Sequence, residues 1–123
     1  MVGERPVESG EKEFLEAVRK VFGIPFVRHS PFTGKRVKKI ALCGGSGSHL
    51  IREAIRAGAD VFLTSDVKYH QFFDAEGKIL IADIGHYESE QFTKEIFYEL
   101  IIKKFPNFAV QFSEIDTNPV KYL

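Results

Sequence analysis

Apolar residues recur at helical spacing near the start of the chain. Phe14, Leu15, Val18 and Phe22 lie three or four positions apart. This spacing predicts an amphipathic helix over residues 11–22, which the glycine at position 23 would end. Residues 1–10 contain two glycines, a proline and a serine that interrupt any pattern, so we expect a loose tail there.

From residue 38 onwards, short apolar runs alternate with helical patterns. The runs predict strands at 39–42, 60–64, 79–84 and 109–115. The helical patterns predict helices at 48–57, 67–73 and 89–105, the last with Phe92, Ile96, Leu100 and Ile101 on its inner side. Residues 79–84 are too continuously apolar to alternate, so this strand should be buried on both faces.

This order of elements is typical of an α/β fold. We expect a small, mostly parallel sheet with flanking helices and right-handed crossovers. The regular alternation begins late, so we divide the chain into an N-terminal leader, residues 1–36, which holds a helix and a loop, and an α/β unit, residues 37–123.

Composition narrows the function classes. The chain has 123 residues, of which 44% are hydrophobic, which is enough for one domain with a core. Its 17 basic residues balance 17 acidic ones, so no general electrostatic attraction to nucleic acid or to an anionic membrane is indicated.

The sequence shows no pattern of a membrane helix, a secretory signal or a disulfide. The apolar runs are shorter than the roughly 20 residues that a membrane helix needs. Residues 1–10 carry two glutamates and have no apolar core, unlike a secretory signal. The single cysteine, Cys43, excludes an intrachain disulfide and fits a reducing compartment, so we expect a cytoplasmic protein.

A histidine and a glutamate stand just beyond the run 79–84. If a helix begins near His86, its imidazole and the Glu90 carboxylate lie on one face, one turn apart. An imidazole and a carboxylate so placed can hold one divalent cation. The alternative is an ordinary weak pair on a solvated helix. Glu88 lies on another side and would favour the helix dipole as a first-turn acid.

A glycine loop joins the strand at 39–42 to the next helix. Its five candidate residues for substrate contact or for support of metal ligands are Gly44, Gly45, Ser46, Gly47 and Ser48. Backbone amides and a helix N-terminus could hold a phosphate or another anion there. The alternative is a tight turn in which Ser48 caps the helix. Neither the Walker pattern nor the full dinucleotide pattern is present.

Asp66 and His70 follow the strand at 60–64, and this loop should emerge at the same sheet edge as the other two. They are therefore candidates for substrate contact or for support of metal ligands. The alternative makes Asp66 a helix cap and His70 a surface or interface residue. Cys43 could be a thiol ligand or a nucleophile, although a small buried residue at a strand end is the commoner role.

The three loops together resemble one family, the Nif-three-like proteins (NGG-one-interacting-factor-three type), also known as GTP cyclohydrolase I type 2 homologues. The matching segments are residues 41–48 (Ala-Leu-Cys-Gly-Gly-Ser-Gly-Ser), 63–70 (Leu-Thr-Ser-Asp-Val-Lys-Tyr-His) and 83–90 (Asp-Ile-Gly-His-Tyr-Glu-Ser-Glu). They follow the family's order and spacing. In the second segment, Ser65 replaces a glycine that is usual in the family.

The resemblance implies a fold of two related α/β halves that face each other across a dinuclear metal centre. It implies that His86 and Glu90 are metal ligands from the C-terminal half. The remaining ligands would come from an N-terminal half with a paired-histidine motif, which this sequence lacks. The chain therefore resembles a C-terminal portion of a longer protein, and residues 1–36 resemble the exit from a domain inserted between the halves.

By the same resemblance, the cofactors are two divalent metal ions per intact site, with zinc, manganese or iron as candidates. The expected activity is that of a metal-dependent hydrolase, and the expected assembly is a homo-oligomer, a hexamer in the parent protein. A nucleotide or another phosphate-containing small molecule is the expected ligand. We expect this chain alone to bind metal weakly or not at all. The alternative functions are a non-catalytic protein-interaction module and a phosphate-binding or nucleotide-binding module.

Overall fold

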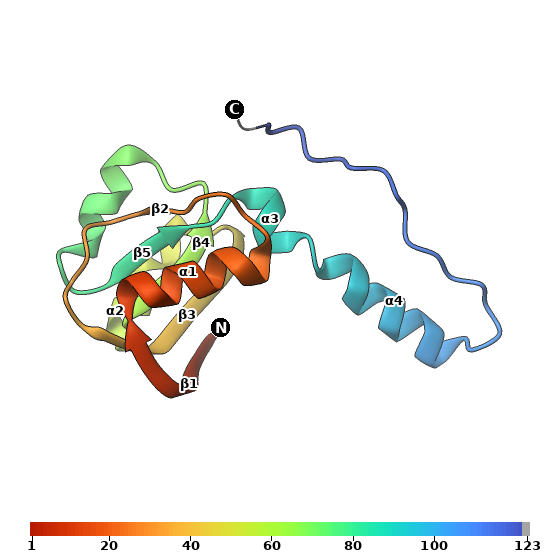
Figure 1. The fold of residues 1–123 in the computed structure, drawn as a ribbon, viewed down its shortest axis with the longest axis horizontal. Coiled ribbons are helices and arrows are strands. Elements are labelled where there is room, and N and C mark those ends of the chain that lie inside the picture. Colours follow the sequence, from red (N-terminus) through yellow and green to blue (C-terminus); the bar gives the residue numbers. More distant parts are fainter. Residues whose placement is uncertain (122–123) are drawn as a thin grey trace. The chain divides into compact units, whose positions relative to one another are not determined.

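A computed structural model describes residues 1–121 of the chain. It contains two compact units, Met1–Ser89 and Glu90–Leu123. The elements of the first unit, shown in Figure 1, are β1 (Val2–Gly10), α1 (Glu11–Phe22), β2 (Arg28–His29), β3 (Arg36–Ser46), the 3₁₀ turn η1 (Ser48–Leu50), α2 (Ile51–Arg56), β4 (Val61–Ser65), the 3₁₀ helix η2 (Tyr69–Ala75) and β5 (Leu80–Asp83). The helix α3 (His86–Glu90) runs across the boundary, and α4 (Thr93–Lys104) belongs to the second unit.

The first unit is built on a five-stranded sheet with the order β1-β3-β4-β5-β2. The three inner strands, β3, β4 and β5, run parallel. The two edge strands, β1 and β2, pair antiparallel with β3 and β5. The expected α/β class with a mostly parallel sheet is therefore confirmed, and residues 1–36 supply both edge strands of that sheet.

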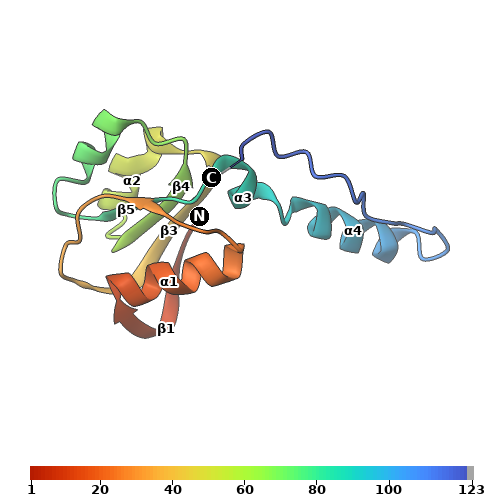
Figure 2. The same ribbon diagram turned by 45° about the horizontal axis from the view of Figure 1, so that its top comes forward.

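The two faces of the sheet carry separate apolar clusters. In Figure 2, α1 lies on one side of the sheet and α2 on the other. Along β4, Val61 and Leu63 pack towards the α1 side, and Phe62 packs towards the α2 side. All four residues of β5 are buried, with Leu80 on the α1 side and Ile81 on the α2 side. The expectation that this strand is covered on both faces is confirmed.

Two predictions about strands were wrong. Residues 1–10 are not a loose tail, because Val2–Gly10 forms β1 through backbone pairing with β3. A register shift between Glu4 and Ser9 accommodates the proline at position 6. The strand expected at 109–115 is absent, since the described residues after Lys104 contain no strand.

One of the four predicted helices has the expected bounds, and the other three are shorter, divided or of 3₁₀ type. The helix at 11–22 is confirmed and ends at Gly23, which adopts a left-handed φ of 65°. The helix expected at 48–57 is the turn η1 followed by α2, and the one expected at 67–73 is the 3₁₀ helix η2. The long helix expected at 89–105 is interrupted at residues 91–92, between α3 and α4.

The prediction that one side of this helix is buried is wrong for the second unit taken by itself. Ile96 and Leu100 are 59% and 58% exposed, and Ile101 is 37% exposed. No residue of α4 is buried in the described structure. Among residues 1–121, no helix has the length and apolar character to cross a lipid bilayer.

Candidate functional site

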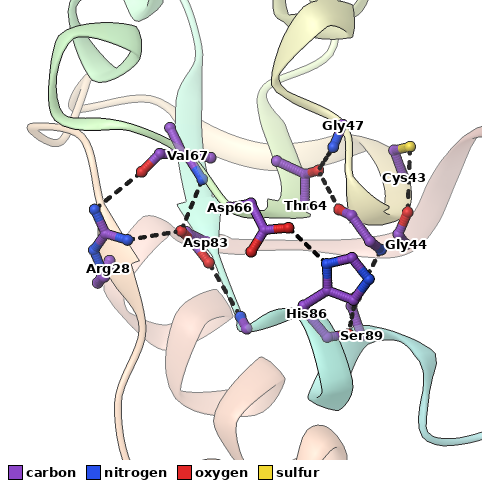
Figure 3. A network of polar contacts seen from close by, with 12 residues as sticks. Arg28, Cys43, Gly44, Gly47, Thr64, Asp66, Val67, Asp83, His86 and Ser89 are labelled. Atoms are coloured by element: carbon purple, nitrogen blue, oxygen red, sulfur yellow. Dashed lines mark hydrogen bonds and ion pairs between the residues drawn. The ribbon is translucent and has the colours of Figure 1, made fainter. Parts of the chain in front are cut away.

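The loops that follow β3, β4 and β5 meet at one edge of the sheet (Figure 3). After β3, the amide of Gly45 donates a hydrogen bond of 2.8 Å to the hydroxyl of Ser89 in α3. After β4, the Asp66 carboxylate contacts the imidazole of His86, which follows β5. The expectation that the three loops share the carboxyl edge of the parallel strands is confirmed.

The contact between Asp66 and His86 is the central feature of this edge. Oδ2 of Asp66 lies 2.6 Å from Nδ1 of His86. An ionised carboxylate can only accept a hydrogen bond, so Nδ1 carries the proton in this pair. In the neutral imidazole, Nε2 then keeps a lone pair, and a histidine binds metal through such a nitrogen. The contact therefore favours the tautomer in which Nε2 of His86 could bind a metal.

Solvent weakens this pair as a source of stability. The side chains of Asp66 and His86 are 48% and 53% exposed, so water and salt screen their attraction. The pair orients the imidazole more than it stabilises the fold.

Asp66 has an unusual backbone conformation. Its φ is 55°, in the left-handed region that aspartate tolerates better than most residues. Ser65, which stands where the family usually has glycine, is a fully buried residue of β4 without a positive φ. The left-handed turn is therefore made by Asp66, and it does not require a glycine at position 65. The Ser65 hydroxyl has no hydrogen-bond partner within residues 1–121.

A buried carboxylate beneath the pair connects two of the loops. Asp83, the last residue of β5, is 6% exposed. Its Oδ2 accepts hydrogen bonds from Nη1 of Arg28 at 3.0 Å and from the amide of Val67 at 3.1 Å. Its Oδ1 accepts one from the amide of Gly85 at 3.1 Å. The charge is thus matched by one guanidinium and two backbone donors, which is what a buried carboxylate needs.

Sequence reasoning missed Asp83 and Arg28. The available signal was an ionisable residue inside the apolar run 79–84, since a carboxylate in a strand buried on both faces must find donors. Arg28 gave no local signal, because it reaches Asp83 only through the pairing of β2 with β5.

The glycine loop is held by hydroxyl groups of the chain itself. The buried hydroxyl of Thr64 accepts a hydrogen bond from the amide of Gly47 at 3.0 Å and donates one to the carbonyl of Gly45 at 3.2 Å. The Gly45 amide is already bonded to Ser89. Two of the amides that an anion would need are therefore engaged, and the loop packs as a tight turn against β4.

The other candidate residues occupy different surroundings. Gly44 and Ser46 are exposed near the end of β3. Ser48 begins η1 and does not cap it, because the N-cap is Gly47 and no side-chain cap bond forms. His70 is exposed in η2 and makes a ring contact with Tyr69, so Asp66 pairs with His86 instead of with His70. Asp66 is not a cap either, since the N-cap of η2 is Lys68.

The described residues do not form a complete metal site. Within residues 1–121, no group of three or more histidine, cysteine, aspartate or glutamate side chains could hold a metal ion. The helix α3 runs from His86 to Glu90, so the helical spacing on which their pairing depends is present. Glu88 lies in the first turn of α3, as expected, and its carboxylate occupies the place where a side chain on Gly85 would be. Cys43 is a partly buried free cysteine whose thiol contacts the carbonyl of Gly44.

The family model described as Duf34/NIF3 (NGG1p interacting factor 3) matches residues 1–119. This chain belongs to that family. The resemblance inferred from the three loops is thereby confirmed, and the glycine loop, Asp66 and His86 lie inside the matched range.

Two curated relatives of this Duf34/NIF3 chain carry the same name. A protein of Staphylococcus epidermidis named GTP cyclohydrolase 1 type 2 homolog is 42% identical over 115 residues, which are 89% of this chain and 31% of that protein. A protein of the same name from Staphylococcus aureus is 35% identical over 117 residues, 91% of this chain and 32% of its own. The chain therefore spans about a third of the length of these relatives.

Solved structures agree on the fold. The Staphylococcus aureus protein SA1388 superposes with a TM-score of 0.85 at 29% identity, covering 99% of this chain and 41% of its own. A Bacillus cereus protein related to NIF3 superposes with a TM-score of 0.83 at 28% identity, covering 99% of this chain and 35% of its own. The α/β fold is thus shared with proteins of the family that are longer than this chain.

Proposed function

We propose that this Duf34/NIF3 chain supplies half of a dinuclear metal site, with His86 and Glu90 as its ligands. The remaining ligands would come from the part of the longer protein that the chain does not span. In that protein, the site would serve a metal-dependent hydrolase of the GTP cyclohydrolase I type 2 homologue group, assembled as a cytoplasmic homo-oligomer such as a hexamer.

The observation that carries this proposal is the hydrogen bond between Asp66 and Nδ1 of His86. A carboxylate on one imidazole nitrogen fixes the tautomer and makes the other nitrogen more basic, as in carboxylate–histidine–metal arrangements. The site also stands at the carboxyl end of a parallel sheet, where α/β proteins bind ligands. The donor set of imidazole and carboxylate suits zinc, manganese or iron.

The chemistry divides between the metal pair and this chain. When bound, two such metals would lower the pKa of a coordinated water towards neutrality and make it a nucleophile. His86 and Glu90 would hold the metals, and Asp66 would orient His86. The turn made by Thr64 and the glycine loop keeps the edge of the sheet rigid around them.

Binding of metal to this chain tests the ligands directly. Two ligands leave most of a coordination shell to water, so calorimetric titration with zinc or manganese should show weak binding or none. Any binding should disappear in His86→Ala and persist in His49→Ala, which removes an exposed histidine of η1. Tight binding that survives His86→Ala would show that the ligands are wrong.

The longer protein offers the complementary test. Elemental analysis of the full-length protein should find about two metals per chain, while this chain carries far less. Metal-dependent hydrolysis in the full-length protein should be abolished by Glu90→Gln if the site is catalytic.

A second candidate is a non-catalytic protein-interaction module. The specific observation is the exposure of large apolar side chains in the second unit, among them Phe97 at 60% and Phe108 at 65%. Exposed apolar patches commonly mark contact surfaces. Partner binding that is unchanged in a metal-free variant would favour this function. A nucleotide or phosphate ligand at the glycine loop has less support, because two amides of the loop are already engaged.

A further inference from the structure

We propose that Arg28 and Asp83 act together as a positioning pair for the contact between Asp66 and His86. They hold Asp66 in its left-handed conformation and thereby aim its carboxylate at Nδ1 of His86. The consequence for metal binding rests on the proposed function, whereas the positioning itself does not.

Asp83 and Arg28 each form a hydrogen bond with the backbone of Val67. The Val67 amide donates to Oδ2 of Asp83 at 3.1 Å, and its carbonyl accepts from Nη2 of Arg28 at 3.0 Å. Nη1 of Arg28 closes the ring with Oδ2 of Asp83 at 3.0 Å. The peptide groups on both sides of Val67 are therefore fixed, and Asp66 is its direct neighbour.

The Asp83 carboxylate also contacts the backbone next to His86. Oδ1 of Asp83 accepts from the amide of Gly85, the residue before His86. One buried side chain thus sets the backbone next to Asp66 with one oxygen and the backbone next to His86 with the other.

The conformation of Asp66 needs such support. A non-glycine residue in the left-handed region is strained, and strain persists only where the surroundings determine the backbone more strongly. The Asp66–His86 contact is half exposed and cannot supply this force. The contacts of Asp83 can, because it is buried and its hydrogen bonds are charge-assisted.

Arg28 is itself held in place. It is paired with Asp83 in the antiparallel register of β2 and β5, and its guanidinium lies 5.3 Å from the ring centre of Phe72. The edge strand β2 therefore places the Arg28 guanidinium at the candidate site, although residues 1–36 were predicted to be a leader.

The test is the tautomer of His86 in the metal-free chain, measured by long-range ¹H–¹⁵N NMR at a pH well above the ordinary histidine pKa of about 6.5. The wild-type chain should show mainly the form with the proton on Nδ1. Asp83→Asn keeps one acceptor oxygen but turns an amide NH₂ towards one of its donors. We expect it to lower the ratio of the Nδ1–H to the Nε2–H form by about fivefold or more, the factor that ~1 kcal/mol gives at 25 °C.

A matched control separates positioning from general damage. Asp60 accepts hydrogen bonds from the amides of Lys38 and Lys39, away from the glycine-loop edge of the sheet. Asp60→Asn likewise removes the charge of a carboxylate that accepts from two backbone amides, and it should leave the His86 tautomer unchanged. Equal changes in Asp60→Asn and Asp83→Asn would overturn the proposal, as would an unchanged tautomer in a folded Asp83→Asn variant.

A second pair of variants keeps the test decisive if Asp83→Asn fails to fold. Arg28→Gln removes the half-exposed cation. Arg36→Gln is its control, because Arg36 donates a hydrogen bond to the backbone carbonyl of Glu8 and forms a 3.9 Å ion pair with the Glu8 carboxylate. Only Arg28→Gln should shift the tautomer, and Arg28→Lys should restore part of it. A shifted tautomer in this chain, together with an unchanged zinc affinity of the full-length protein carrying the same substitution, would support the positioning pair and count against the proposed metal role.

Discussion

Gly47 is the residue at which the loop after β3 packs most tightly against β4. A Cβ atom added there would lie 2.7 Å from Cβ and 2.8 Å from Sγ of Cys43, and it would also collide with the Thr64 hydroxyl. Thr64 is fully buried and holds the loop, so it cannot move away without losing its hydrogen bonds. We expect Gly47→Ala to lower the free energy of unfolding by about 1–3 kcal/mol, the usual cost of overpacking.

Urea unfolding monitored by circular dichroism measures this cost. The control is Gly3→Ala, because Gly3 has no positive φ and no atom within 4 Å of an added Cβ. Its unfolding free energy should change little. An equal loss in the two variants would contradict the steric explanation.

The pKa of the Glu76 carboxyl depends chiefly on Lys78 and to a smaller extent on Arg52. A hydrogen bond from Lys78 lowers the pKa of the Glu76 carboxyl below its ordinary value of 4.5. Because the folded pKa is lower than the unfolded one, the stabilisation is present above the ordinary pKa and is lost as the pH falls through the folded pKa. NMR titration should show the pKa of Glu76 return towards 4.5 in Lys78→Ala. Lys20→Ala, on the far helix α1, should leave it unchanged.

The positions of site residues could be predicted from the sequence where those residues directly follow a strand. His86 and Asp66 were placed at one edge because the carboxyl ends of parallel strands coincide. Their direct contact was not predictable, since it depends on the left-handed φ of Asp66. The role of Arg28 depends on an edge strand 55 residues away in sequence from Asp83.

Among the elements, the buried ones could be predicted and the edges could not. The strands β4 and β5 are buried on both faces, so their sequences carry a continuous apolar signal. In the edge strand β1, Ser9 is the only buried residue. The strand forms through backbone pairing with β3, which requires no apolar pattern in the sequence. Residues 109–115 carry a strand-like composition, but strand formation depends on a partner and the described chain provides none.

Two helices of equal length differ in what supports them. Both α1 and α4 have 12 residues, but α1 buries Phe14, Leu15 and Val18, whereas α4 buries none. A helix of this length is marginal in water without packing. Hydrogen–deuterium exchange of this chain should therefore be much faster in α4 than in α1, and α4 should become protected in the full-length protein. Equal protection of the two helices in the isolated chain would contradict this expectation.

At the scale of the whole molecule, the chain is a third of its relatives by length, and its second unit exposes apolar side chains. Ile96, Phe97 and Leu100 are each more than half exposed on α4. Soluble monomers seldom expose large contiguous apolar patches, so these side chains need a cover. A second copy of the chain can supply such a cover with the same surface.

We therefore expect the isolated chain to self-associate through the second unit as its concentration rises. Sedimentation velocity should show an increasing sedimentation coefficient, which the double substitution Ile96→Lys and Leu100→Lys should reduce to the monomer value. Val21→Lys is the control, because Val21 is also an exposed apolar residue, at 69%, but it stands on α1 in the first unit. A monomeric wild-type chain at high concentration, or an equal effect of the Val21 variant, would show that the α4 side chains do not drive association. An effect confined to the α4 substitutions would mean that association buries the apolar side chains of α4. Such burial would explain why the apolar periodicity of this helix predicted an inner side.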